Sequence, residues 1–235
     1  MNLRLLQLGD SALPIGGYSH SWGLEAAVDR GLVHDPPSLE RWCRFWLRDV
    51  VGPFEGVIVA AVCRAAVEQD WPVLLNANEL VRVTLSPPTL RQASRDMGEQ
   101  LLALAESWPW AAPHIQALRQ AAESPATDHR PVATVREWHH APVFATLAAA
   151  AGGEPAEAVA VYLHQAALGV IGAGVRAIPI GHTHGQQLLA RLHDDIRALA
   201  EELAYCDLET AGSFCPAYEV LCHAQSRLYT RLFRS

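Results

Sequence analysis

The chain has 235 residues, a length that suits one large domain or two small ones, and half of its residues are apolar. A formal net charge of −7 argues against a general nucleic-acid binder, because such proteins are usually basic. All 18 basic residues are Arg, which excludes a lysine Schiff base, a lysine general base and the P-loop lysine.

The cysteines and the apolar segments indicate a cytoplasmic protein. Five Cys make an odd count and none are spaced C-x-x-C, so we expect neither a disulfide framework nor a zinc knuckle. The start of the chain lacks an apolar segment of signal-peptide length. The most apolar stretch, 156–175, contains Glu157, His164 and Gln165, so it predicts a buried helix and not a membrane span.

Residues 11–25, SALPIGGYSHSWGLE, begin with a turn signal. The Pro and the paired Gly would turn the chain, after which a serine would cap a helix over about 21–30. Two chemical alternatives stay open. The glycines could present N–H groups to an anion, or Ser19 and His20 could act as nucleophile and base in an all-α hydrolase. No P-loop sequence and no G-x-S-x-G elbow supports either alternative.

The same segment is rich in polar and aromatic side chains. Tyr18, His20 and Trp22 form a dense group for a mere turn, and aromatic side chains of this kind are enriched at interfaces. We therefore favour the interpretation that this segment starts a helix and that Tyr18 and His20 face a partner.

Prolines mark the boundaries of the helices that follow. Pro is tolerated in the first turn of a helix but costs about 3 kcal/mol in its interior. Apolar stripes of helical period follow Pro37, Pro88 and Gly185, and Ser86 should cap the second of these helices. The pattern predicts helices over about 21–30, 39–50, 55–67, 72–84, 90–104, 110–123, 142–151, 156–176, 188–203 and 224–233.

The fold class follows from this inventory. Only 133–135 and 178–180 could be extended, and both are too short to build a sheet. We predict one all-α domain over residues 1–235, a bundle of about ten helices, with 124–142 as a long internal connection.

The helix predicted over 156–176 should be the central helix of the bundle. It contains Gly169, Gly172 and Gly174, and each interior Gly costs about 1 kcal/mol relative to Ala. Close approach of a neighbouring helix would compensate for that cost. The alternative is a loosely packed helix end near Pro179.

Histidines offer the only metal ligands worth weighing. In GHTHG, residues 181–185, His182 and His184 could bind a divalent metal if the segment is extended. On a helix, residues two apart point to different faces and could hardly share an ion. Cys222-His223 and His139-His140 are further pairs. The alternative for each is a solvated or core histidine, and we expect no preformed catalytic metal site.

The last residues, RLYTRLFRS, combine Arg with aromatic and aliphatic side chains. On the helix predicted over 224–233, Arg, Leu and aromatic residues would each recur four positions apart. The helix macrodipole favours cations at that end but does not explain Tyr229 and Phe233 there. Arg and aromatic residues commonly anchor interfaces, so 224–235 is predicted to be a docking tail.

Four segments resemble the urease accessory protein UreF family. LPIGGYSHSWGLE is similar to L-P-[VI]-G-x-[FY]-[ST]-x-S-x-G-L-E, and RQASRDMGEQL to R-x-x-S-x-x-M-G-x-x-L. GVRAIPIGHTHGQQLL is similar to V-[RK]-L-x-P-[LF]-G-Q-x-x-x-Q, and YTRLFRS to Y-S-R-L-F-R-S. The segments occur in the family's order between Leu13 and Ser235. Two positions depart from the pattern: Gln225-Ser226 stand where the family has His-Glu, and His182 stands where it has Gln.

The resemblance implies an all-α, often dimeric protein that is not an enzyme and carries no cofactor. Such proteins bind UreD, also called UreH, and recruit the GTPase UreG. The assembly docks on apo-urease and couples GTP turnover to nickel delivery. The alternative function is a nickel-binding carrier that uses His182 and His184.

The resemblance also suggests where the partners would bind. Tyr18, Ser19 and His20 would meet Arg231 and Arg234 on one surface, where UreD binding would order the tail. The aromatic anchors of the tail would be Tyr229 and Phe233. Arg176 matches a basic position of the family and is expected at a partner surface or a water-lined passage.

Overall fold

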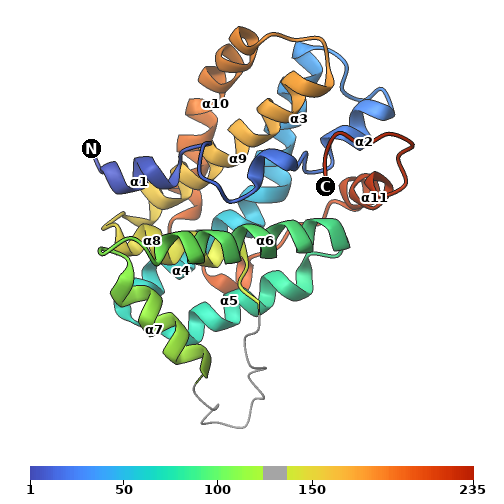
Figure 1. The fold of residues 1–235 in the computed structure, drawn as a ribbon. Coiled ribbons are helices and arrows are strands. Elements are labelled where there is room, and N and C mark those ends of the chain that lie inside the picture. Colours follow the sequence, from blue (N-terminus) through green and yellow to red (C-terminus); the bar gives the residue numbers. More distant parts are fainter. Residues whose placement is uncertain (124–136) are drawn as a thin grey trace.

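The computed structural model describes residues 1–123 and 137–235, and this part of the chain contains helices and no strand (Figure 1). The all-α prediction is confirmed. The elements are α1 (Leu3–Leu8), η1 (Gly17–Ser19), α2 (Leu24–Asp29), α3 (Pro36–Phe45), η2 (Trp46–Gly56), α4 (Val57–Glu68), α5 (Trp71–Thr84), α6 (Pro88–Ala105), α7 (Ala112–Glu123), α8 (His140–Ala150), α9 (Pro155–Ala177), α10 (His182–Leu203), η3 (Leu208–Thr210) and α11 (Pro216–Gln225).

Caps and prolines explain where several of these helices begin. Asp35 accepts the backbone N–H of Ser38 at 2.8 Å, and prolines occupy the first turn of α3. Asp70 caps α5 in the same way, and a capping box stands before α9. Side-chain acceptors satisfy N–H groups that a helix start leaves unpaired, so each boundary is set locally.

The expected cap at Ser86 is wrong. Helix α6 begins at Pro88 with Pro87 in the capping position, and no side chain caps it. The Ser86 hydroxyl instead lies 3.5 Å from the His223 imidazole. A proline in the first turn has no N–H to satisfy, so α6 can begin without a cap.

Helix α1 was not predicted. The Asn2 side chain caps it by accepting the N–H groups of Arg4 and Leu5 at 3.1 and 3.3 Å. The Asn2 amide also donates to the carbonyl of Ala151 at 3.0 Å, which ties α1 to the end of α8. Buried Leu5 and Leu8 complete the attachment. Six residues are too few for a helical period to stand out in the sequence.

The helices predicted over 39–50 and 55–67 are one continuous helical rod, which is a correction. The π-helical segment η2 joins α3 to α4 and contains Pro53. A proline inside a helix leaves a carbonyl one turn earlier without its N–H partner. Here the Cys215 thiol lies 3.3 Å from the Asp49 carbonyl and supplies a replacement donor. The chain before α11 thus compensates for the proline.

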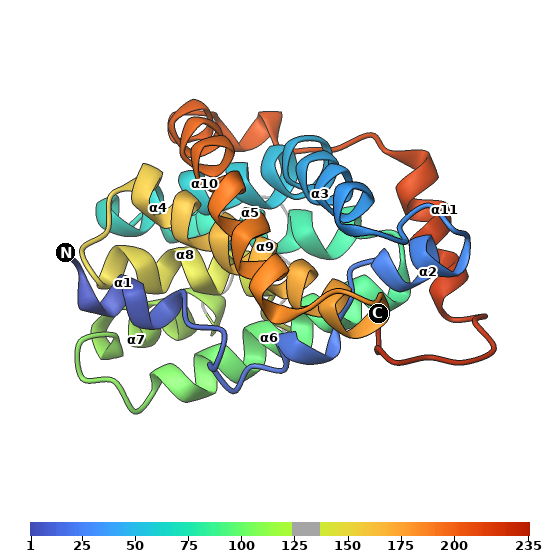
Figure 2. The same ribbon diagram turned by 90° about the horizontal axis from the view of Figure 1, so that it is seen from above.

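The predicted central helix corresponds to α9, which packs against α1, α2, α3, η2, α4, α8 and α10 (Figure 2). A Cβ added at Gly174 would lie 2.6 Å from the Leu39 side chain, so α3 approaches closely there. Within the described part of the chain, a Cβ at Gly172 would meet no atom within 4 Å, and a Cβ at Gly169 would meet only Trp22, at 4.0 Å. Close approach therefore accounts for one of the three glycines.

Two helical stretches, Pro36–Glu68 and Pro155–Ala177, are long and apolar enough to cross a membrane by length and composition. Their most apolar windows are 72% and 50% buried inside the molecule. Core helices pass the same test, and both stretches pack against several other helices.

Two predictions concern segments between or after helices. Of the connection predicted over 124–142, residues 124–136 lie outside the described part, and 140–142 already belong to α8. The helix predicted over 224–233 is wrong: α11 ends at Gln225, and the residues after it follow a non-helical path back to the body (Figure 1). The reason is a set of long-range hydrogen bonds described below.

Candidate partner-binding surface

The loop before α2 adopts a backbone conformation that glycine favours at two positions. Gly16 and Gly23 have φ of 84° and 79°. A Cβ at Gly23 would also lie 2.8 Å from the Cys222 sulfur of α11, so the loop and α11 approach closely. Trp22 has a φ of 54°, an uncommon value for a bulky residue. Such strain is held by surrounding contacts, and here the contacts come from the end of the chain.

Ser235 lies against this loop. Its backbone oxygen accepts the N–H of Ser21 at 2.5 Å, the N–H of Trp22 at 3.2 Å and the Ser21 hydroxyl at 2.8 Å. Its own hydroxyl lies 2.7 Å from Nδ1 of His20. One residue thus satisfies several donors that a strained loop would otherwise leave unpaired.

A buried carboxylate holds the tail two to three residues before Ser235. Glu25 of α2 accepts the backbone N–H groups of Leu232 at 2.5 Å and Phe233 at 3.3 Å. The side-chain amide of Gln225 donates to the same carboxylate. Hydrogen bonds to an ionised acceptor are about twice as strong as neutral ones. The tail therefore takes its N–H partners from Glu25 and not from a helical turn of its own.

Arg176 stands between two aromatic rings. Its guanidinium carbon lies 3.7 Å from the centre of the Tyr18 ring and 4.5 Å from the centre of the Phe233 ring. Its Nε donates to the Gly172 carbonyl at 3.0 Å, which fixes the side chain along α9. Phe233 is buried at 4% exposure, whereas Tyr18 is 73% exposed. This Tyr18–Arg176–Phe233 stack joins the loop before α2, the central helix α9 and the tail.

The remaining predicted site residues lie along the same loop and tail. Ser19 accepts the N–H of Arg234 through its carbonyl at 2.8 Å, and the Arg234 side chain is exposed. Tyr229 and Arg231 are exposed. The chain between α11 and the C-terminus bows away from the body (Figure 2). Six of the eight predicted residues therefore lie together at the docked end of the tail, and the other two project from it. The structure places the tail there within the single chain.

His20 is buried beneath the tail. The pKa of His20 is lowered to about 4, mainly by burial and also by the nearby Arg234, against a smaller opposite effect of Asp96. The imidazole is therefore neutral at pH 7 and packs against Trp22 at 5.5 Å between ring centroids. A buried neutral ring bonded to Ser235 holds the tail, and it offers no triad for Ser19, whose hydroxyl donates to the Gly16 carbonyl.

A cavity of about 210 Å³ opens beneath the stack. Tyr18 and Arg176 line it, together with aromatic and polar side chains from several segments: Trp22, Trp46, Glu55, Ser94, His140 and Tyr162. A second cavity of about 60 Å³ shares Trp22, Trp46 and Glu55 as lining. The sequence pattern gave no sign of either cavity, because their walls come from segments far apart in the chain.

Two ionisable groups inside the larger cavity are strongly perturbed. Burial raises the pKa of Glu55 to about 7, while the hydrogen bond from the Tyr162 hydroxyl at 2.9 Å acts in the opposite direction. Burial lowers the pKa of His140 to about 4, and its Nε2 has no hydrogen-bond partner among residues 1–123 and 137–235. Perturbed groups in a cavity are candidates for ligand contact.

The structure also places the histidines weighed as metal ligands. His182 and His184 lie in the first turn of α10 and are exposed. Two positions apart on a helix, they point to different faces. His139 and His140 are buried in the interior, where Ser94 lies 3.2 Å from the His139 imidazole.

The fold and the candidate surface define an all-α protein whose distinctive feature is a tail docked beside a cavity, built from Arg, aromatic and buried hydrogen-bonding residues. A family model for UreF matches residues 33–193, more than half of the chain. The chain belongs to the UreF family.

Full-length relatives agree. The urease accessory protein UreF of Ectopseudomonas mendocina is 33% identical over 231 residues, covering 98% of this chain and 97% of that protein. The protein of the same name from Pseudomonas fluorescens strain SBW25 has the same identity and coverage, and that of Arthrobacter sp. is 32% identical over 235 residues, with 99% and 96% coverage. The family predicted from the four segments is confirmed. These relatives are named for an accessory role and not for a reaction, in agreement with the prediction of a non-enzymatic protein.

Proposed function

We propose that this chain is a non-enzymatic scaffold in urease maturation. It binds UreD/UreH, recruits and regulates the GTPase UreG, and so supports GTP-dependent nickel insertion into apo-urease. It acts in the cytoplasm as a homodimer. The observation that carries the proposal is the Tyr18–Arg176–Phe233 stack, which brings three of the family's matched segments to one place.

The chemistry of the surface supports a protein partner. An exposed Tyr beside Arg residues supplies aromatic area and fixed donors, and such residues dominate binding energy at interfaces. The exposed residues of this surface are Tyr18, Tyr229, Arg231 and Arg234. The end of a chain is usually poorly ordered unless contacts hold it in place. An acidic or aromatic surface on the partner would be complementary to this cluster.

The docked tail supports a specific role for its last residues. Phe233 is buried, and the backbone of 232–235 is bonded to Glu25, Ser19 and the loop before α2. A partner that contacts Tyr18 or Arg234 would therefore read the docked state of the tail. Regulation of UreG through this surface would follow from whether the tail is docked.

The proposal is tested by co-purification with UreD, UreG and apo-urease, with and without GTP, combined with urease activity in cells. Deleting 232–235 removes Phe233 and the bonds to Glu25 and should abolish complex formation and activity. Tyr229→Ser changes a fully exposed side chain and should weaken the complexes while leaving the fold intact. Arg82→Gln, an exposed Arg on α5 paired with Glu79, is the matched control and should behave as wild type.

Two results would contradict the proposal. Wild-type protein that forms no complex with any of the three partners would remove the scaffold role. A 232–235 deletion that folds and retains both complex formation and urease activity would remove the tail from it.

A further inference from the structure

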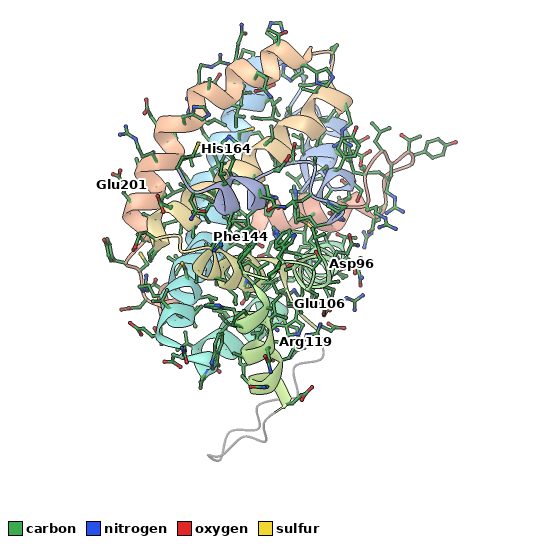
Figure 3. The ribbon with its side chains drawn as sticks, turned by 60° about the vertical axis from the view of Figure 1, so that its left-hand side comes forward. Asp96, Glu106, Arg119, Phe144, His164 and Glu201 are labelled. Atoms are coloured by element: carbon green, nitrogen blue, oxygen red, sulfur yellow. The ribbon has the colours of Figure 1, made fainter. Side chains whose placement is uncertain are left out.

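The α9–α10 hairpin brings two histidines together that no motif pairs. His164 of α9 and His193 of α10 have ring centroids 5.8 Å apart with planes inclined by 35°. The two helices run antiparallel and pack along their length, with Gly185 of α10 opposite Ile171 and Val175 of α9. Figure 3 labels His164 at the point where α9 passes beside α10.

Neither the His164 ring nor the His193 ring forms a hydrogen bond with another residue in the described part of the chain. Leu189 and Ile196, which stand four positions before and three after His193, are buried in the seam between the helices. Two facing imidazoles with free nitrogens at the edge of an apolar seam suggest a ligand between them.

The spacing suits a shared metal ion. An imidazole nitrogen coordinates a late first-row ion at about 2.0–2.1 Å, which puts the ring centroid about 3.2 Å from the ion. Two imidazoles on one ion then have centroids between about 4.5 Å, at right angles, and about 6.4 Å, in opposite positions. The observed 5.8 Å falls within this range. His193 is exposed, so its ring can rotate to share an ion without moving either helix.

We propose that His164 and His193 form a two-imidazole binding site for a divalent ion of the Ni²⁺, Cu²⁺ or Zn²⁺ type. Imidazole is a good ligand for these ions and a poor one for Mg²⁺ or Ca²⁺. No group of three or more His, Cys, Asp or Glu suited to a metal occurs among residues 1–123 and 137–235. Water or a partner's side chain therefore completes the coordination sphere. Asp194, beside His193, is paired with Arg197 at 3.0 Å.

This site goes beyond the proposed scaffold role and is separate from His182 and His184. His182 and His184 lie in the first turn of α10 and point to different faces. The rings of His164 and His193 face each other from two neighbouring helices. The ion would lie between two rings whose centroids are 5.8 Å apart, and it would stay exchangeable because His193 is exposed. Binding is a property of the single chain, so it can be tested without any partner.

The test is calorimetric titration of the isolated full-length chain with Zn²⁺ and Ni²⁺, together with the electron paramagnetic resonance spectrum of its Cu²⁺ complex. We expect one saturable site whose Cu²⁺ spectrum shows two coordinated nitrogens. Either His164→Gln or His193→Gln should weaken binding at least about tenfold. His182→Gln and His184→Gln are the matched controls and should bind as wild type.

Three results of this titration would contradict the proposed metal site. No saturable binding up to about 1 mM ion overturns the proposal, because imidazole pairs that bind more weakly would have no specificity. Equal loss in all four variants, or loss only in the His182 and His184 variants, also overturns it. His193 is exposed, so His193→Gln keeps the test valid even if the half-buried His164 variant folds poorly.

Discussion

A single buried carboxylate, that of Glu25, receives two backbone N–H groups from the tail. We predict that Glu25→Ala releases the tail, because it strands these donors and the Gln225 amide at once. Hydrogen bonds to a charged group are worth about 1.5–3 kcal/mol each. Amide hydrogen exchange should show loss of protection at Leu232 and Phe233. Glu79→Ala, which removes an exposed ion pair on α5, is the control and should leave that protection unchanged.

The Tyr18–Arg176–Phe233 stack depends on the shape of the guanidinium as well as its charge. Arg176→Lys keeps the charge but loses the planar group that covers both rings, and Arg176→Gln loses charge and plane. Stacks of this kind contribute about 0.5–2 kcal/mol. We expect both variants to raise the rate of proteolytic cleavage after Arg231, Gln more than Lys. Equal cleavage in wild type and both variants would mean that the stack does not hold the tail.

Buried imidazoles give the protein a pH dependence with a definite sign. Burial lowers the pKa of His20, His139 and His140 to about 4, below the ordinary value of 6.5. The unfolded chain therefore binds more protons between pH 6.5 and 4, and the free energy of unfolding falls as pH falls through this window. Each of these histidines lowers the free energy of unfolding by up to about 3 kcal/mol at pH 4. The pKa of Glu55 is raised to about 7, so this carboxyl has the opposite effect: it raises the free energy of unfolding as the pH falls from 7 to 4.5.

Urea unfolding at pH 6.5, 5.5 and 4.5 measures this dependence. Three histidines outweigh one carboxyl, so stability should fall on acidification. His140→Phe removes one of the three titrating groups and keeps an aromatic ring, and it should make the fall shallower by about one proton. An unchanged slope in His140→Phe would contradict the buried neutral state of this residue.

At the scale of elements, one glycine contact fixes α6 against the start of α8. A Cβ at Gly98 would overlap the backbone of Trp138 and His139, which cannot move like a side chain. Gly98→Ala should therefore lower the free energy of unfolding by several kcal/mol, as overpacking against backbone does. Gly172→Ala on α9 is the matched control. A Cβ there would meet no described atom within 4 Å, so replacing this interior helical Gly should stabilise the fold by up to about 1 kcal/mol.

Thermal unfolding of the two alanine variants compares them directly. We expect a lowered unfolding midpoint for Gly98→Ala and an equal or raised midpoint for Gly172→Ala. A loss of stability at Gly172 as large as that at Gly98 would mean that helix propensity and open space do not decide the outcome at either position.

Helix boundaries were predictable where the cause is local. The prolines in its first turn mark α3, and an apolar stripe of helical period marks α10. The π-helical η2 was not predictable in the same way. Pro53 is a helix breaker on its own, and its tolerance depends on a thiol from Cys215, more than 160 residues later. Local sequence has no access to that compensation.

At the scale of the whole molecule, six of the eight residues predicted for the partner surface lie together, whereas the geometry that joins them was not predictable. Tyr18, His20 and the Arg-aromatic tail stood out as unusual for a turn and a chain end. The tail itself was predicted as a helix, because its residues recur four positions apart. The acceptors that unwind it, Glu25 and the Ser19 carbonyl, lie about 210 residues earlier and carry no signal of their role.

The cavity beneath the surface was beyond prediction for the same reason. Glu55, His140 and Tyr162 come from η2, α8 and α9 and meet only in the folded chain. Family membership, by contrast, was accessible from sequence because four short segments preserve residue types in order, and the full-length relatives agree.

The most direct test of the central claim is site-specific photo-crosslinking from the chain to UreD, UreG and apo-urease. A benzophenone side chain is placed at Tyr18 and at Tyr229, which are exposed on the proposed surface, and at Val83, which is 57% exposed on α5. We expect crosslinks to UreD or UreG from positions 18 and 229 and none from position 83. Crosslinks from position 83 alone, or from none of the three while the complex is intact, would contradict the central claim.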